Sequence, residues 1–238
     1  MKRSSFLLVL LGSLALAQGL PIDAPFTGPG PNLPTGWVVG GSQGAYDSDN
    51  NFQTTTYTPY ITTDGYLRLT ENTNWTTGYA YYNQPFPSGI GFKIDFEYLA
   101  WGGNGADGIT LFLFDGNTPN FHIGVAGGGL GYCQGTGTDQ PGGLSNAYVG
   151  IAFDEYGNFA TDDHLCPDED QGYNHNNNGR IPDSVTIRGP GNGTQGYLHL
   201  ITTSTPGIDY PNPDPNVNPT PPAPTDDNPP GCITLGPS

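Results

Sequence analysis

Residues 103–114 read Gly-Asn-Gly-Ala-Asp-Gly-Ile-Thr-Leu-Phe-Leu-Phe and dominate the predicted fold. The run Ile109 to Phe114 is apolar on nearly both faces, so we expect a strand that is buried between two layers. Asp107 stands among glycines directly before this strand. An aspartate beside glycine is often a plain turn residue. Its place at the mouth of a buried strand instead favours contact with a ligand.

A second strand runs into acidic and amide residues further along the chain. Residues 149–158 read Val-Gly-Ile-Ala-Phe-Asp-Glu-Tyr-Gly-Asn, and the run Gly127-Gly128-Gly129 lies between the two segments. Glycines let a ligand approach the backbone closely. Carboxylate and amide oxygens that converge at strand ends can hold one hard cation. The three segments together predict a calcium-assisted sugar-binding face rather than a catalytic cleft.

Alternation of apolar and polar residues predicts further strands, and no window shows a helical period. Residues 92–98 place Phe92, Ile94, Phe96 and Tyr98 on one face. Other strand candidates are 66–70, 79–82, 148–153, 185–188 and 197–202. Short strands joined by turns rich in Gly, Asn and Pro predict a sandwich of antiparallel sheets.

The chain divides into three predicted regions. Residues 1–17 have a basic start, a short apolar run and a small-x-small cleavage site, which indicate an export signal. No later run is long enough to span a bilayer, so we expect a secreted protein, either periplasmic or extracellular at the cell surface. Residues 18–204 form the β-domain, and residues 205–238 form a proline-rich tail or linker.

The charge argues against nucleic acid and anionic membranes as partners. The net charge is -16 at pH 7. After residue 17, the basic residues are Arg68, Lys93, Arg180 and Arg188. Binding to phosphates or anionic lipids depends on Lys and Arg, so we expect neither partner and no membrane insertion. Most of the carboxylates serve solubility.

The cysteines number three, too few for a disulfide-dense scaffold. In an oxidising compartment we expect Cys133 to pair with Cys166, because both follow loops that flank the same strand. Cys232 would then be unpaired or intermolecular. The alternative is three free thiols.

The motifs Ala106-Asp107-Gly108, Gly127–Gly131 and Phe153–Asn158, in this order on an all-β pattern, resemble the L-type (legume-like) lectin domain. The likeness covers residues 25–203 and is greater to bacterial secreted and adhesin-borne members than to seed lectins. It implies an antiparallel jelly-roll (concanavalin-like) β-sandwich with a sugar site at loop tips on one edge. It also implies glycans or cell-surface polysaccharide as partners, as in adhesion.

The resemblance assigns roles to particular residues. It implies that Asp107 accepts hydrogen bonds from sugar hydroxyls and that the peptide bond before it is cis. A backbone N–H of Gly128 or Gly129 and the amide of Asn158 would complete the carbohydrate site. Trp101 is the tryptophan that we expect to touch the ligand.

The same resemblance implies one calcium ion at the loop. Its ligands would be Asp154, the carbonyl of Tyr156, Asn158 and Asp163, with Asp162 as the alternative to Asp163. The ion would lock the loop and preorganise the sugar-binding residues. Ala152 and Ser184 stand where plant members have a glutamate and a histidine of the transition-metal site, so we expect no manganese.

The resembled domain continues with several more strands where this chain has its proline-rich tail. The predicted sandwich is therefore incomplete at its C-terminus. Either it is truncated, or the tail is an insertion before a missing continuation, or another chain supplies the closing strands by self-association or as an assembly partner.

Two alternatives to a sugar-binding module remain from the sequence. One is a structural or adhesive surface module with a degenerate sugar site. The other is a jelly-roll glycosidase, which needs two carboxylates on one face of a strand. Asp154 and Glu155 are adjacent and would point to opposite faces. We therefore expect no enzyme activity.

Overall fold

The computed structural model describes residues 22–24, 26, 33–87, 89, 91–103, 105–135, 142–160 and 181–204. These residues form antiparallel strands and one 3₁₀ turn, with no α-helix among them. The all-β antiparallel prediction is confirmed for this part of the chain. None of these residues belongs to a helix long and apolar enough to cross a membrane.

The strands form three sheets. An N-terminal sheet has the order β2-β1-β5, a two-stranded sheet pairs β3 with β4, and a C-terminal sheet has the order β10-β9-β7-β8-β11 with β6 also paired to β7. The bounds are β1 (Trp37–Tyr46), β2 (Phe52–Thr56), β3 (Tyr60–Ile61), β4 (Leu67–Arg68), β5 (Thr76–Tyr82), β6 (Gly108–Phe114), the 3₁₀ turn η1 (Gly127–Gly129), β7 (Ala147–Asp154), β8 (Ser184–Arg188), β9 (Gly191–Asn192), β10 (Gln195–Gly196) and β11 (His199–Ser204).

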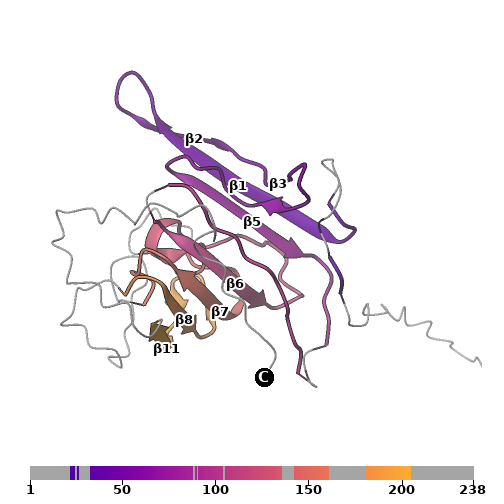
Figure 1. Ribbon diagram of the computed structural model, residues 1–238. Helices are drawn as coiled ribbons and strands as arrows, with labels where there is room; N and C mark the ends of the chain where they lie inside the picture. Colours follow the sequence, from indigo (N-terminus) through magenta and orange to yellow (C-terminus); the bar gives the residue numbers. More distant parts are fainter. Residues whose placement is uncertain are drawn as a thin grey trace, which may run out of the picture.

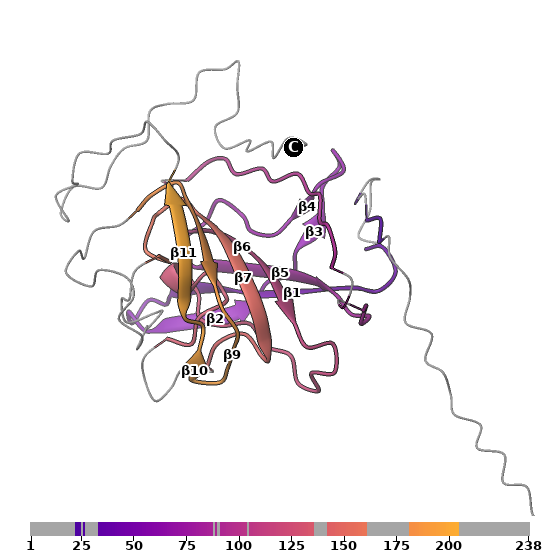
Figure 2. The same cartoon turned by 90° about the horizontal axis from the view of Figure 1, so that it is seen from below.

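The N-terminal and C-terminal sheets lie over each other as two layers (Figure 1). Their strands run in clearly different directions when seen from below (Figure 2). Aromatic rings join the layers: the ring centroid of Tyr81 on β5 lies 4.3 Å from that of Phe121 and 5.5 Å from that of Phe114 on β6. Edge-to-face and offset ring pairs of this kind add to the apolar burial between layers.

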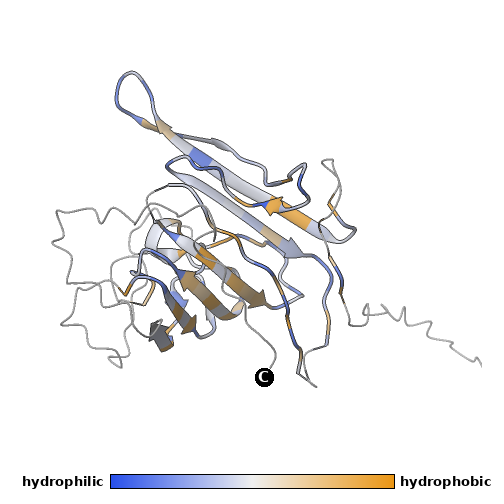
Figure 3. Ribbon diagram, viewed as in Figure 1, coloured by the Kyte–Doolittle hydropathy of each residue, from blue (hydrophilic) through white to orange (hydrophobic). Residues whose placement is uncertain are grey.

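The hydrophobic core belongs to the C-terminal sheet and its loops. Its fully or nearly fully buried members are Tyr132, Cys133, Leu144, Ala147, Ala152, Phe159 and Tyr197. Most of them come from loops rather than from strands, so the loops fold back over the sheet. Figure 3 shows that the strands beneath these loops, β6, β7, β8 and β11, also carry many apolar residues.

The prediction of a strand at residues 92–98 is wrong. Residues 91–100 have no strand pairing, and Phe92, Ile94 and Phe96 are 41–43% exposed. Phe96 instead packs its ring against Phe153 of β7. Alternation decides which side chains share a face, but a strand also needs a neighbouring backbone to accept its hydrogen bonds.

Other predicted strands are confirmed with altered bounds. The candidates 79–82, 148–153 and 185–188 lie within β5, β7 and β8. Only Leu67–Arg68 of the candidate 66–70 is strand, and the last strand begins at His199 because Tyr197 is a buried loop residue. The segment 109–114 is half-buried rather than fully buried.

Candidate functional site

The loop at Asp107 lies directly against the end of β7. Gly108 pairs in register with Asp154, and the backbone carbonyl of Asp107 accepts hydrogen bonds from the N–H groups of Glu155 and Tyr156, both at 3.1 Å. The Ala106–Asp107 peptide bond is cis, as the resemblance led us to expect. The two acidic strand ends that the sequence singled out therefore form one edge.

The Asp107 carboxyl group stands on the exposed rim of this edge. Nearby protein atoms remove part of its hydration and raise the pKa of Asp107 above its ordinary value. An exposed carboxylate can accept hydrogen bonds from the hydroxyl groups of a ligand.

The glycine run forms the turn η1 beside Asn158. Gly128 and Gly129 are buried, and a Cβ atom added to Gly128 would lie 2.3 Å from Nδ2 of Asn158. Only a residue without a side chain leaves room for the Asn158 amide here. The structure thus brings together Gly128 and Asn158, which are far apart in the sequence, and the run serves as the surface on which Asn158 rests.

Asp154 shapes the loop that follows β7. Its carboxylate is buried and accepts the N–H groups of Gly157 and Phe159, each at 2.7 Å. These bonds order residues 155–159.

The donors present suit calcium as far as the described residues reach. The Asp154 carboxylate and the Oδ1 atom of Asn158 are both buried oxygens of the same loop, the kind of donor that calcium prefers. Asp162 and Asp163 lie outside the described residues. Within the described ranges, no group of three or more His, Cys, Asp or Glu residues is placed to hold a metal ion. Ser184 of β8 pairs in register with Asp154 of β7, and Ala152 lies buried on β7.

Tyr98 and Glu155 also belong to the site, although neither was predicted to. The hydroxyl group of Tyr98 donates a hydrogen bond to Oε1 of Glu155, whose own N–H holds Asp107. Burial, with the Glu155 charge beside it, raises the pKa of Tyr98, so the hydroxyl group stays protonated and donates. The bond ties residues 91–100 to the Asp107 edge. The one signal in the sequence for this contact is that the alternating run 92–98 ends in a tyrosine, Tyr98, rather than in a purely apolar residue.

Arg188 supports the candidate site and was likewise not predicted from the sequence. It is fully buried, and its guanidinium group donates to the carbonyl of Phe159 through Nε (2.9 Å) and Nη2 (2.8 Å) and to that of Tyr197 through Nη1 (2.9 Å). Its Cζ atom also lies 5.2 Å from the ring centroid of Phe159. Arg188 thereby fixes the far end of the loop that carries Asn158.

Cys133 is disulfide-bonded and fully buried, and it lies four residues after the glycine turn. Its partner is outside the described residues, as is Cys166, so the expected Cys133–Cys166 pair stays a prediction. A bridge at this position ties the glycine turn to another part of the chain.

Searches against protein-family models and curated proteins found no match for this chain.

Proposed function

We propose that this protein is a secreted, non-catalytic carbohydrate-binding module with a jelly-roll, lectin-like architecture. The observation that supports it best is the convergence of three separate segments on one edge: the Asp107 carbonyl binds the Glu155 and Tyr156 N–H groups, and Gly128 packs on Asn158. A reachable carboxylate offers an acceptor, and an amide on the same edge offers a donor, for sugar hydroxyl groups.

In this proposal Asp107 accepts hydrogen bonds from the sugar, and Asn158 and the backbone of Gly128–Gly129 lie beside it. Tyr98, Asp154 and Arg188 position these groups. A rigid support of this kind lowers the entropy lost on binding.

A glycan array tests the proposal, with the Asp107→Ala variant beside the wild type. Hydrogen bonds to a charged acceptor are each worth about 1.5–3 kcal/mol, so the variant should bind at least about tenfold more weakly. Asp49→Ala removes the same charge from an exposed turn and serves as the control. Equal glycan affinity in a folded Asp107→Ala protein would overturn the assignment, and release of cleaved sugar would identify a glycosidase instead.

Calcium is part of the proposal. Asp154, Tyr156, Asn158 and Asp163 would hold one ion, which would lock the loop and leave the sugar to the side chains. Binding to the native state alone raises thermal stability by mass action, so millimolar calcium should raise the melting temperature and EDTA should reverse the change. A melting temperature that responds to neither would show that the loop works without metal.

A further inference from the structure

A second pocket lies on the β3–β4 hairpin, outside the edge that carries Asp107. Its volume is about 370 Å³, and its walls include Tyr60, Asp64, Tyr66, Arg68 and Trp101. This volume lies within the range of roughly 300–1,000 Å³ typical of small-molecule sites.

Three aromatic side chains contribute to the walls of this pocket and remain open to solvent. Tyr60 is 38%, Tyr66 46% and Trp101 58% exposed. Exposed rings gathered around one hollow mark a binding site more often than scattered ones do. Rings of this kind offer flat apolar faces, which suit the apolar C–H face of a sugar ring, and their polar edges stay wet.

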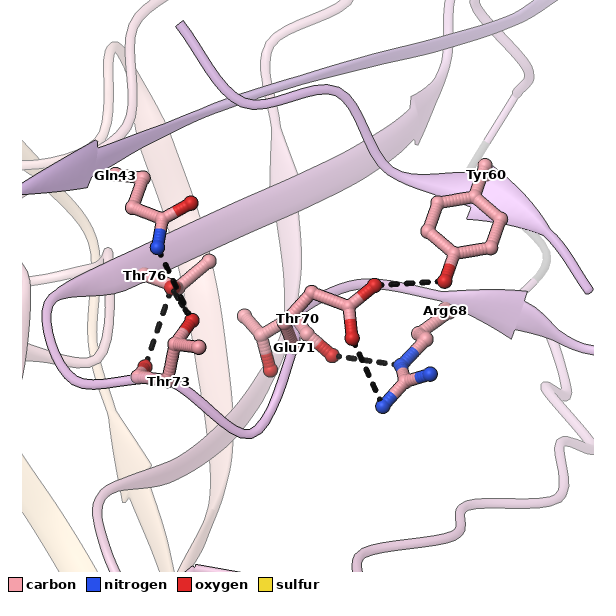
Figure 4. Close-up of polar contacts among 7 residues, drawn as sticks. All are labelled: Gln43, Tyr60, Arg68, Thr70, Glu71, Thr73 and Thr76. Carbon is pink, nitrogen blue, oxygen red and sulfur yellow. Dashed lines mark hydrogen bonds and ion pairs between the residues drawn. The ribbon is translucent and has the colours of Figure 1, made fainter. Parts of the chain in front are cut away.

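Hydrogen bonds hold the pocket in shape before any ligand arrives. Tyr60 donates to Oε1 of Glu71 at 2.6 Å, and Oε2 of Glu71 lies 3.0 Å from Nη2 of Arg68. The Nε atom of Arg68 donates to the carbonyl of Thr70 at 3.3 Å (Figure 4). The guanidinium carbon of Arg68 also lies 5.8 Å over the ring of Trp101. This arrangement lowers the entropy cost of binding.

The charges of the pocket favour a neutral ligand. Glu71 balances the positive charge of Arg68, and Asp64 adds a carboxylate on the hairpin turn. The chain as a whole carries a net charge of -16. An acidic sugar would meet repulsion here, whereas a hydroxyl group of a neutral sugar can donate to Asp64.

We propose that this pocket is a second subsite for a neutral sugar unit, which stacks on Trp101 and Tyr66 and donates a hydroxyl group to Asp64. The inference rests on the proposed function, because it extends the same ligand along the surface. Trp101 and Asp107 lie close together in the chain. Six residues of chain separate them by at most about 22 Å, a span that an oligosaccharide can cover.

Two linked subsites predict that affinity depends on the length of the ligand. Once one sugar unit is bound at Asp107, the next contact is effectively intramolecular and raises the overall affinity. A monosaccharide reaches only one subsite and gains nothing from the second.

The test titrates the full chain with glucose, mannose and galactose and with linear neutral hexasaccharides of each, by calorimetry. We expect Trp101→Ala and Tyr66→Ala to bind the hexasaccharide about tenfold more weakly and to keep wild-type affinity for the monosaccharide. Trp75→Ala is the matched control, because Trp75 is 61% exposed and does not border the pocket. Melting curves confirm that each variant is folded.

The outcomes separate the two proposals. Wild-type hexasaccharide binding in both Trp101→Ala and Tyr66→Ala, with loss in Asp107→Ala, overturns the second subsite and keeps the first. Loss in Trp101→Ala with no change in Asp107→Ala overturns the Asp107 site and keeps this pocket. Absence of binding by the wild-type protein to every sugar overturns both.

Discussion

The two layers of this protein differ in how they are packed. The C-terminal sheet has a buried core that its own loops close over, with Tyr132, Leu144 and Phe159 at 0% exposure. In the N-terminal sheet every residue of β2 is exposed and every residue of β5 is half-buried. Figure 3 shows the same contrast in hydropathy. The loops, rather than the opposing sheet, therefore bury the core of the layer that carries the candidate site.

The two candidate ligand sites lie in parts of the protein that differ in packing. The Asp107 edge sits on the well-packed layer, where buried groups such as Asp154 and Arg188 fix the loops. The aromatic pocket sits on the β3–β4 hairpin, where exposed side chains hold one another. We therefore expect the stability of the chain to respond strongly to changes under the first site and weakly to changes at the second.

Replacement of Arg188 should give the largest effect. Arg188→Met leaves the buried carbonyl groups of Phe159 and Tyr197 without these donors, and we expect it to lower the unfolding free energy by about 3–5 kcal/mol. Arg68→Met, the matched change on β4, removes a half-exposed ion pair worth roughly 0–1 kcal/mol. Denaturant titration measures both, and equal losses would contradict the contrast between the layers.

Removal of a buried hydroxyl group should have a smaller effect. The hydroxyl group of Tyr132 donates to the carbonyl of Gly189 at 2.8 Å inside the core, so Tyr132→Phe should cost about 1–2 kcal/mol. Tyr46→Phe on β1, where the ring is 56% exposed, should stay within about 0.5 kcal/mol of the wild type. Thermal melting of the two variants checks this expectation. A larger loss of stability in Tyr46→Phe than in Tyr132→Phe would contradict it.

A methyl group on the glycine turn should affect binding more than folding. In Gly128→Ala the new Cβ atom displaces the end of the Asn158 side chain, so we expect about tenfold weaker glycan binding, or about 1.4 kcal/mol. Gly89→Ala adds the same group in open space and should leave binding unchanged. Unaltered affinity in Gly128→Ala would remove Asn158 from the site.

The pKa values of two aspartates should be shifted in opposite directions from the ordinary value. The N–H groups of Asn51 and Asp49 lower the pKa of Asp47 in the β1–β2 turn, whereas desolvation raises the pKa of Asp107. On acidification Asp107 should take up its proton at a pH above its ordinary pKa of 3.8, and glycan affinity should fall with that step. Carboxyl NMR titration would locate both steps, and a lower pKa for Asp107 than for Asp47 would contradict this ordering.

The contributions of Asp107 and Asp47 to the stability of the fold change with pH in opposite directions. The native state keeps the Asp107 proton to higher pH than the unfolded chain, so this group's contribution to stability falls as the pH rises through that window. The contribution of Asp47 is present above its unfolded pKa and is lost as the pH falls through the lower folded value.

The strands with strong apolar patterns were predictable, and the weakly patterned ones were not. Residues 108–114 and 147–154 form β6 and β7 close to the expected bounds. β1 and β2 were missed, because Gly40, Gly41 and the run of threonines in residues 54–56 show no apolar alternation. The β-propensity of those threonines was the one available signal.

Burial within β8 shows another limit of pattern reading. Alternation would turn Val185 and Ile187 inward, yet both are half-buried while Ser184, Thr186 and Arg188 are fully buried. Loops cover the second face of this strand, and the carbonyl groups of those loops satisfy the Arg188 donors. The alternation of side chains along one strand carries no information about where such loops pack.

The all-β character, the strands around Asp107 and Asp154, and the acidic surface could be predicted, because they follow from composition and from the two-residue period of a strand. Three features depend on how the chain folds as a whole: Gly128 packs against Asn158, Tyr98 donates to Glu155, and residues 91–100 stay outside the sheets. Those contacts join segments far apart in the chain. They depend on strand register and loop closure, which no local pattern of side chains specifies.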